Sequence, residues 1–238
     1  MDKFIRTLER RDTVSQEEKS LLAQLRSRER SFDAREEVVA EGSRPTSSLL
    51  LTEGFACRAK TLANGKRQIT AIHIAGDYVD LHSYLLKKMD HSVIAITPCK
   101  FIVTDHTSVK RLLESSEHLT RLLWLMTIID AATHREWITS MGRRSSMAHL
   151  AQLFCELYVK CEIVGLTEGY SYNFPLTQAE LGDVLGLSVV HVNRTLQDLR
   201  AEGVIQWEDR MVTILNWQRL QRLADFDPTY LNLNQEPR

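Results

Sequence analysis

The sequence predicts an α+β chain in which a small antiparallel β-domain precedes a long helix and a C-terminal winged helix-turn-helix. Three observations predict this order. Short strand-like segments separated by turn residues fill residues 36–105, and a helical pattern without glycine or proline runs through residues 118–141. Two capped helices followed by a hairpin pattern then occupy residues 176–215.

The composition is that of an ordinary globular protein, with 43% hydrophobic and 26% charged residues. No segment approaches the roughly 18 consecutive apolar residues of a membrane span, and the charged first residues lack the apolar core of a secretion signal. We therefore expect a cytoplasmic protein. The formal net charge of −1 is low for a DNA-binding protein, so a DNA-binding surface must come from a local cluster of basic side chains.

Motifs for metal or catalytic chemistry are missing. The cysteines are scattered and form no C-x-x-C pair: Cys57, Cys99, Cys155 and Cys161. Neither metal ligation by cysteine alone nor a disulfide framework is expected. The chain also lacks a glycine-rich phosphate loop, H-E-x-x-H and G-x-S-x-G. An iron or zinc site built from His73, His82, His91 and acidic neighbours is the basis of an enzyme alternative, but no motif supports an enzyme.

The first 105 residues predict one short helix and then strands. Ser15 and Glu18 form a capping box, which indicates a helix within residues 13–27. The strand-like segments that follow include VVAEG, SLLLTEG, SVIAIT and CKFIVTD. The Asn64-Gly65 pair predicts a hairpin with a type I′ turn, in which both central residues have positive φ. Together these segments predict a small β-sandwich or roll.

The helix over residues 118–141 carries a heptad pattern with alternating steps of three and four: Leu119, Leu122, Met126, Ile129 and Thr133. This seam predicts pairing with the same helix of a second copy. Other apolar residues lie off the seam and are expected to pack on the β-domain: Leu123, Leu125, Ile128, Trp137 and Ile138. The alternative is one amphipathic core helix within a single subunit. Residues 142–146 are polar and predict a hinge.

The C-terminal third predicts a helix-turn-helix. A capping box formed by Thr177 and Glu180 starts the first helix, and Gly186 ends it. Ser188 caps the second helix, VVHVNRTLQDLRAE, which Gly203 ends. The segment VIQWEDRMVTIL then predicts a two-stranded wing. The alternative is a helical hairpin of an enzyme, but the order helix, turn, helix, hairpin favours DNA binding.

The candidate base contacts lie near the start of the second helix, because this end of a recognition helix enters the major groove. Arg194 can donate two hydrogen bonds to guanine O6 and N7. Asn193 or His191 can bond a base edge or a phosphate, and Val189 or Val190 can contact a thymine methyl group.

The candidate phosphate contacts are hydroxyl and basic side chains around the same helix. Ser188 and Thr195 supply hydroxyl groups, and Arg210 supplies a charge on the wing. The amides at the start of the helix are a further phosphate site.

These motifs together resemble the Crp/Fnr superfamily of bacterial transcription regulators over roughly residues 15–220. The resemblance rests on LTEG at 51–54, NGKRQI at 64–69, AGD at 75–77, the long helix, and LTQAELGDVLGLSVVHVNRTLQDLRAEGVI at 176–205. It implies a double-stranded, jelly-roll-like β-roll of the cyclic-nucleotide-binding-like type. It also implies a homodimer, a palindromic double-stranded DNA operator and contact with RNA polymerase. The rival interpretation is a regulatory module that acts through protein contacts.

Several departures from the family bear on the effector. Cyclic-AMP-binding members have a Gly-Glu turn followed by an Arg-Ser pair that holds ribose and phosphate. In this chain Gly76-Asp77 replaces the Gly-Glu turn, and His91-Ser92 replaces the Arg-Ser pair. Loss of this arginine argues against cyclic AMP. No cysteine lies in residues 1–40, which argues against the iron–sulfur cluster of oxygen-sensing members. His82 matches the haem ligand of carbon-monoxide-sensing members, but their Cys ligand and N-terminal proline have no counterpart, so haem is the minor alternative.

The recognition helix departs from the family as well. Many members carry a glutamate two residues after the capping residue, where this chain has Val190, followed by His191. Arg194 matches the family's base-reading arginine. The half-site sequence is therefore not expected to copy that of well-known members.

An unknown small-molecule effector is expected between the β-roll and the long helix. The candidate residues are Tyr78, Asp80, Leu81, His82, His91, Met126, Ile129, Asp130, Thr133, His134 and Trp137. The alternative is that these are structural polar groups and no ligand is needed. The expected domains are an effector-sensing β-roll (1–117), a dimerisation helix and hinge (118–142) and a DNA-binding domain (143–238).

Overall fold

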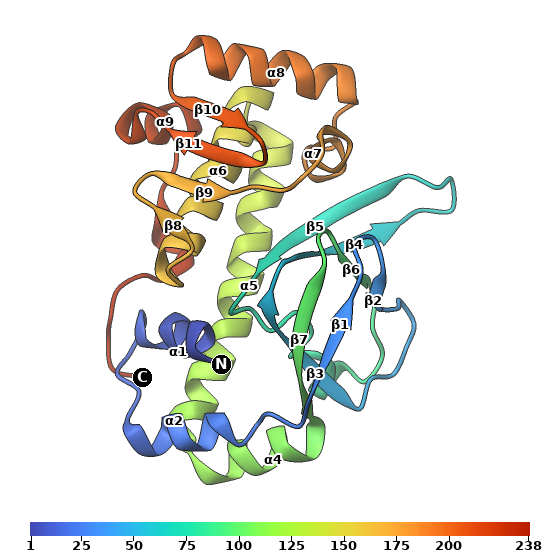
Figure 1. The fold of residues 1–238 in the computed structure, drawn as a ribbon, viewed down its shortest axis with the longest axis vertical. Coiled ribbons are helices and arrows are strands. Elements are labelled where there is room, and N and C mark those ends of the chain that lie inside the picture. Colours follow the sequence, from blue (N-terminus) through green and yellow to red (C-terminus); the bar gives the residue numbers. More distant parts are fainter. The chain divides into compact units, whose positions relative to one another are not determined.

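The computed structural model describes residues 1–238, which form two compact units. The first unit contains residues 1–60, 70–131 and 232–238, and the second contains residues 61–69 and 132–231. Figure 1 labels the strands and most of the helices of both units. None of the helices combines the length and the apolar character that crossing a membrane requires.

Two antiparallel sheets form the β-domain of the first unit, as the sequence predicted. Their strand orders are β1-β7-β3 and β2-β6-β4-β5 (Figure 1). The strands are β1 (Arg28–Phe32), β2 (Glu37–Val39), β3 (Ser47–Glu53), β4 (Phe55–Thr61), β5 (Arg67–Ile74), β6 (Ser92–Ala95) and β7 (Cys99–Asp105). Successive side chains of a strand point to opposite faces, so Leu49 and Leu51 of β3 join Phe101 and Val103 in the core between the sheets.

Helices cover the other face of the β1-β7-β3 sheet. They are α1 (Asp2–Glu9), α2 (Gln16–Ala23), α4 (His106–Ser115) and the first part of α5 (Glu117–Arg143), whereas the short α3 (Ser83–Leu86) follows β5. Leu50 and Ile102, which alternate with the inward residues of β3 and β7, pack in a second core with Leu8, Leu22 and Leu119. The predicted capping box starts α2, with Ser15 and Glu18 as its members.

Two N-terminal elements and one turn differ from the sequence-based expectations. Helix α1 and strand β1 were not predicted; β1 is a charged edge strand in which only Phe32 is buried. The Asn64-Gly65 turn is not type I′, because Gly65 has a φ of 81° but Asn64 is not among the residues with positive φ. Instead, Gly65 N–H donates to the carbonyl of Leu62, and Leu62 N–H donates to that of Lys66. This is the three-residue hairpin in which a glycine bulge follows a type I turn.

The predicted pairing seam of α5 is wrong. Leu119 and Leu122 are fully buried within their own chain, in the core against α1 and α2. The large apolar residues that α5 leaves exposed are instead Trp124 (66%), Ile128 (45%), Ile138 (64%) and Met141 (45%). The helix therefore has two apolar stripes. The stripe identified from the heptad spacing packs in the core of its own subunit, and the other is exposed.

His118 at the start of α5 links three segments of the first unit. Its Nδ1 lies 2.6 Å from Glu18 Oε1, and its Nε2 lies 3.1 Å from Asp12 Oδ2. Asp12 Oδ2 also accepts the backbone N–H of Arg238 at 2.6 Å. Burial alone would lower the pKa of His118, but the hydrogen bonds to the two carboxylates outweigh it and raise that pKa above 6.5.

This raised pKa predicts how stability depends on pH. Because the folded state holds the His118 proton more tightly than the unfolded state, the stabilisation is complete below pH 6.5 and is lost as pH rises through the folded-state pKa. We expect His118→Gln to remove that loss, measured as a shallower fall of the urea midpoint between about pH 6.5 and 8.5. His134→Gln, which changes a histidine outside this network, serves as the control. An unchanged slope in His118→Gln would contradict the assignment.

The second unit is a helical domain with a small sheet. It contains α6 (Ser146–Ile163), β8 (Thr167–Glu168), β9 (Ser171–Asn173), α7 (Gln178–Leu185), α8 (Val189–Ala201), β10 (Ile205–Glu208), β11 (Met211–Ile214), α9 (Trp217–Ala224) and a 3-10 turn (Pro228–Leu231). Its antiparallel sheet has the order β10-β11-β9-β8. The wing was predicted, whereas β8 and β9 were not.

A buried carboxylate organises the interior of this unit. Glu156 of α6 is 2% exposed. Its Oε2 accepts the indole N–H of Trp137 at 3.0 Å and the hydroxyl of Tyr230 at 2.8 Å. The amide of Gln152 donates to the same oxygen at 3.3 Å. The carboxylate thus joins α5, α6 and the 3-10 turn, which are distant in sequence.

Candidate nucleic-acid interface

The first helix of the predicted helix-turn-helix forms with the expected ends. Thr177 Oγ1 accepts the N–H of Glu180 at 3.2 Å, and the Glu180 carboxylate accepts the N–H of Thr177 at 2.7 Å. Gly186 ends α7 in the left-handed region with a φ of 68°. Gly182 is a further requirement that the sequence did not reveal, since a Cβ there would lie 2.7 Å from the carbonyl oxygen of Leu187. The turn therefore needs two glycines.

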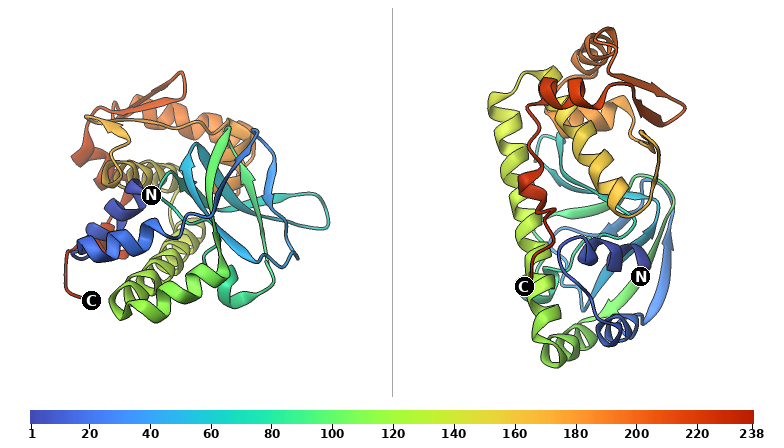
Figure 2. Two further views of the ribbon diagram at one scale, coloured as in Figure 1. Left: turned by 60° about the horizontal axis from the view of Figure 1, so that its bottom comes forward. Right: turned by 90° about the vertical axis from the view of Figure 1, so that its left-hand side faces the viewer.

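Helix α8 presents one apolar and one exposed face. Its apolar residues Val192, Leu196 and Leu199 are buried, and so are Leu181, Val184 and Leu185 of α7, as the sequence predicted. Ser188 caps the helix by accepting the N–H of His191 at 3.3 Å. The exposed residues near its start are Val189 (45%), Val190 (72%), His191, Asn193 and Arg194. Figure 2 shows α8 at the surface of the second unit, beside the β10–β11 hairpin.

Thr195 does not belong to the exposed set. Its side chain is 2% exposed, and its hydroxyl donates to the carbonyl of His191 at 3.0 Å, one turn earlier in α8. The hydroxyl is thus buried and already engaged, so it is not presented to a phosphate. The assignment of Thr195 as a phosphate contact was therefore wrong, because position in the sequence does not distinguish an outward hydroxyl from one turned back onto its helix.

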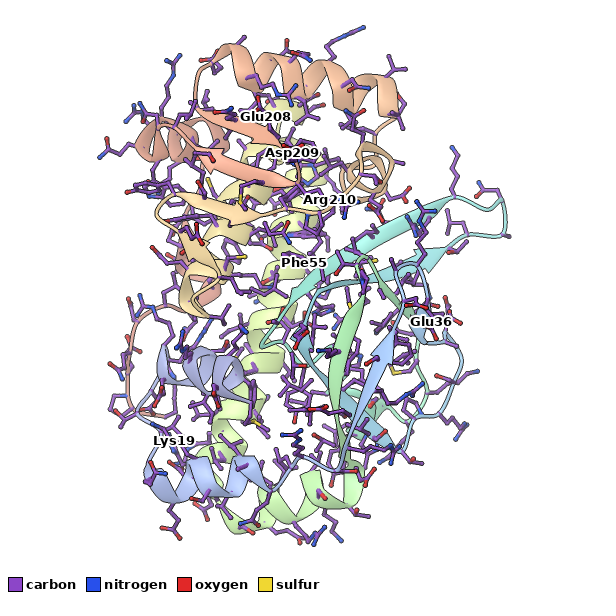
Figure 3. All side chains as sticks on the ribbon, in the orientation of Figure 1. Lys19, Glu36, Phe55, Glu208, Asp209 and Arg210 are labelled. Carbon is purple, nitrogen blue, oxygen red and sulfur yellow. The ribbon has the colours of Figure 1, made fainter.

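The wing carries the type I′ turn that the sequence placed elsewhere. Glu208 pairs with Met211, and the two residues between them, Asp209 and Arg210, have φ values of 48° and 64°. Figure 3 labels both at the hairpin tip. Arg210 is exposed, and its carbonyl accepts the N–H of Phe174 at 2.7 Å, which fixes the turn to the rest of the unit. Its guanidinium remains available to an anion.

Arg200 is a basic residue of α8 that the sequence did not assign. Its Nη2 donates to the carbonyl of Trp207 on β10 at 3.0 Å. The side chain therefore ties the exposed face of α8 to the wing, so the two elements keep a fixed relation. The exposed guanidinium of Arg194, in contrast, forms no ion pair within the chain.

In the first unit, several of the predicted effector residues gather around a residue that was not predicted, Arg58 of β4. Arg58 is 6% exposed; its Nη1 donates to Asp130 Oδ2 at 2.8 Å and its Nη2 to the carbonyl of Val79 at 3.2 Å. The rings of His82 and His91 lie 5.1 Å apart. Burial, followed by the charge of Arg58, lowers the pKa of each of these histidines to about 4.

Asp80 is the acidic member of this cluster and is fully buried. Its Oδ1 accepts the N–H of Leu49 at 2.6 Å, whereas its Oδ2 has no hydrogen-bond partner. Burial raises the pKa of Asp80 to about 7. The Nε2 atoms of His82 and His91 and the Nε of Arg58 are also buried without partners. Unpaired buried polar atoms on this scale are unusual in a structure whose polar groups serve only folding.

The remaining effector candidates lie elsewhere. The hydroxyl of Tyr78 is 2.8 Å from that of Thr104, and its ring packs on Phe4, so it belongs to the helix-covered core. Leu81 and Met126 are partly buried against that core, and Ile129 is buried. Thr133, His134 and Trp137 belong to the second unit, where Trp137 bonds Glu156. The polar atoms of Tyr78 and Trp137 are thus already engaged.

No group of three or more histidine, cysteine, aspartate or glutamate side chains is arranged to hold a metal ion. All four cysteines are buried as free thiols. They are divided between the units, with Cys57 and Cys99 in the first and Cys155 and Cys161 in the second. This donor set does not fit an iron–sulfur cluster.

Comparison with known proteins connects both units to one group. Residues 29–116 match the model of the cyclic nucleotide-binding domain, and residues 148–223 match that of the Crp-like helix-turn-helix domain. The transcriptional activator protein FnrL of Cereibacter sphaeroides is 25% identical, with 83% of this chain and 81% of the relative covered. The nitrogen fixation regulation protein FixK of Bradyrhizobium diazoefficiens is 26% identical, with 81% and 80% covered.

The solved structures agree with the fold. FixK2 from Bradyrhizobium japonicum superposes with a TM-score of 0.76 at 24% sequence identity, and the match covers 84% of this chain and 98% of that one.

Proposed function

Because the chain belongs to the Crp/Fnr superfamily, whose helix-turn-helix regulators bind DNA as dimers, we propose that two copies of it bind a palindromic operator. In this proposal each copy inserts the start of α8 into a major groove, and the two grooves lie about one helical turn apart. The wing and Ser188 contact the flanking phosphates. The protein is a cytoplasmic transcription regulator and has no catalytic role.

The observation that carries this proposal is the exposed start of α8. The guanidinium of Arg194 is unpaired, and the neighbouring Asn193 and His191 are exposed beside it. A rigid helix that offers an arginine and small polar groups to solvent suits base-edge recognition. The overall charge of −1 supplies no general attraction to DNA, so these local groups bring both affinity and sequence preference.

The exposed stripe of α5 supports the dimer. Its members alternate in steps of three and four along the helix: Arg121, Trp124, Ile128, Ala131, Arg135 and Ile138. This is the spacing of a two-helix seam, and three of its members are large apolar residues open to solvent. We therefore assign residues 118–142 to dimerisation and the hinge, residues 1–117 to an effector-sensing domain and residues 143–238 to DNA binding.

The buried cluster around Arg58 supports a regulatory ligand. Its unpaired atoms include both hydrogen-bond donors and acceptors, which suits a small polar molecule. A ligand that binds one conformation more tightly would shift the protein towards it and so change operator affinity. By analogy with the family, the bound dimer acts through RNA polymerase.

Alanine in place of Arg194 tests the DNA-binding proposal. Operator sequences are first selected from random duplexes with the intact protein. Loss of a bidentate arginine–guanine pair is expected to cost about 1–3 kcal/mol of binding free energy and to relax the preference at one base pair. Arg222→Ala, which removes an exposed arginine of α9, is the matched control. Unchanged affinity and preference in Arg194→Ala would exclude the reading role.

A further inference from the structure

His191 is held at three points, each by a hydroxyl side chain. Ser188 Oγ accepts its backbone N–H, and Thr195 Oγ1 donates to its carbonyl. The third contact comes from another element: Ser146 Oγ lies 3.2 Å from His191 Nε2. The first two contacts fix the backbone of the residue, and only the third acts on the ring.

Ser146 lies at the junction between α5 and α6, which several hydrogen bonds stabilise. It is the first residue of α6, whose cap Ser145 accepts the N–H of Ala148 at 3.2 Å. The preceding Arg144 donates to Glu136 Oε1 at 2.5 Å and to Ser140 Oγ at 2.6 Å, both on α5. The orientation of the His191 ring is therefore connected, through Ser146, to the junction between the long helix and the DNA-binding domain.

We propose that Ser146 is a positioning residue, whose hydroxyl orients the His191 ring so that Nδ1 donates a hydrogen bond to an acceptor atom on bound DNA. The two ring nitrogens point in diverging directions, so a bond at Nε2 directs Nδ1 away from Ser146. Nδ1 of His191 has no partner within the chain. The inference rests on the proposed DNA-binding function, which it deepens by assigning the role of one residue.

The chemistry of DNA determines the direction of these hydrogen bonds. Phosphate oxygens and the N7 and O6 atoms of guanine are acceptors and outnumber the donors that a protein meets at the groove. Nδ1 must then carry the proton, and Nε2 must accept a hydrogen bond. When the serine hydroxyl donates that bond to Nε2, the neutral ring is held as the Nδ1–H tautomer before DNA arrives.

The first test uses the free protein and does not depend on DNA. The ¹⁵N resonances of the His191 ring distinguish the two neutral tautomers, and the signal is assigned by its loss in His191→Gln. We expect the Nδ1–H form in the intact protein and in Ser146→Thr, which keeps the hydroxyl. In Ser146→Ala the Nε2–H form should grow. Identical ring resonances in all three proteins would overturn the proposal, whether or not an operator is found.

The second test is a double-mutant cycle with the selected operator. We expect Ser146→Ala to weaken binding about 3- to 10-fold, the range for one lost hydrogen bond. Ser146→Thr should restore it, and Ser146→Ala should have no further effect in a His191→Ala background. Additive losses would mean that Ser146 acts independently of His191, and would overturn the proposal.

The same measurements distinguish the two sources of the acceptor. If Nδ1 bonds a base, the loss in Ser146→Ala is confined to operators that carry one particular base pair. If it bonds a phosphate, the loss is uniform across sequences. Either pattern supports the proposal, since both require an ordered ring. Operator affinity that is unchanged in Ser146→Ala would overturn it.

Discussion

Replacing Ile128 with aspartate is expected to separate the dimer into monomers and to weaken operator binding by about 100-fold or more. Ile128 is 45% exposed at the middle of the α5 stripe, between Trp124 and Ala131. A carboxylate there would be buried without a partner whenever two α5 helices pair, at a cost of several kcal/mol. A monomer then binds each half-site separately and loses the gain from simultaneous contact.

The matched control changes another exposed apolar residue, which lies outside α5. Leu85→Asp alters a side chain that is 77% exposed in α3, so it introduces the same kind of charge away from the seam. Sedimentation equilibrium gives the mass of each variant, and operator titrations give its affinity. A dimeric Ile128→Asp protein would show that the exposed stripe of α5 is not the pairing surface.

Local signals in the sequence were the most reliable. Ser15, Thr177 and Ser188 cap helices where predicted, and Gly186 ends α7. A cap is formed by residues that lie only a few positions apart in the sequence, so the sequence alone reveals it. The hydrophobic faces of α7 and α8 were predicted for the same reason. The fold class followed from the order of these elements, and the family followed from the resemblance of motifs such as residues 176–205.

The errors occurred where residues far away in the sequence determine the burial of a side chain or the type of a turn. Both apolar stripes of α5 have helical periodicity, and only contact with α1 and α2 shows that Leu119 and Leu122 face inward. The type I′ turn lies at Asp209 and Arg210 rather than at Asn64-Gly65, because strand register outweighs the local preference for glycine. Strand β1 has no hydrophobic pattern of its own and exists because β7 pairs with it.

The candidate sites, like the fold, were predicted only in part. Exposure of the start of α8 followed from its periodicity, whereas the inward turn of Thr195 and the Ser146–His191 contact did not. Arg58 was missed because a lone arginine within a strand pattern gives no signal of burial. Its partner Asp130 is 72 positions away along the chain, and only the folded structure shows the pair.

Removal of the Glu156 side chain is expected to destabilise the second unit by about 2–5 kcal/mol. In Glu156→Ala the donors of Trp137, Tyr230 and Gln152 would lose their shared acceptor inside the protein, and a cavity would remain beside them. Gln152 still donates to the hydroxyl of Tyr230 at 2.9 Å, so the link from α5 through Trp137 is the one that is lost entirely. The loss should appear as a lower urea midpoint of the helical unit, followed by tryptophan fluorescence.

Glutamine at the same position separates charge from shape. Burial raises the pKa of Glu156, and a glutamine is uncharged, resembles the carboxyl group in size and keeps one acceptor oxygen for the surrounding donors. Glu156→Gln should therefore cost only about 1 kcal/mol. Glu168→Ala, on the exposed strand β8, should change little. If alanine and glutamine were equally destabilising, the negative charge itself would be the stabilising feature, and the network would be an ionic one rather than a hydrogen-bonded one.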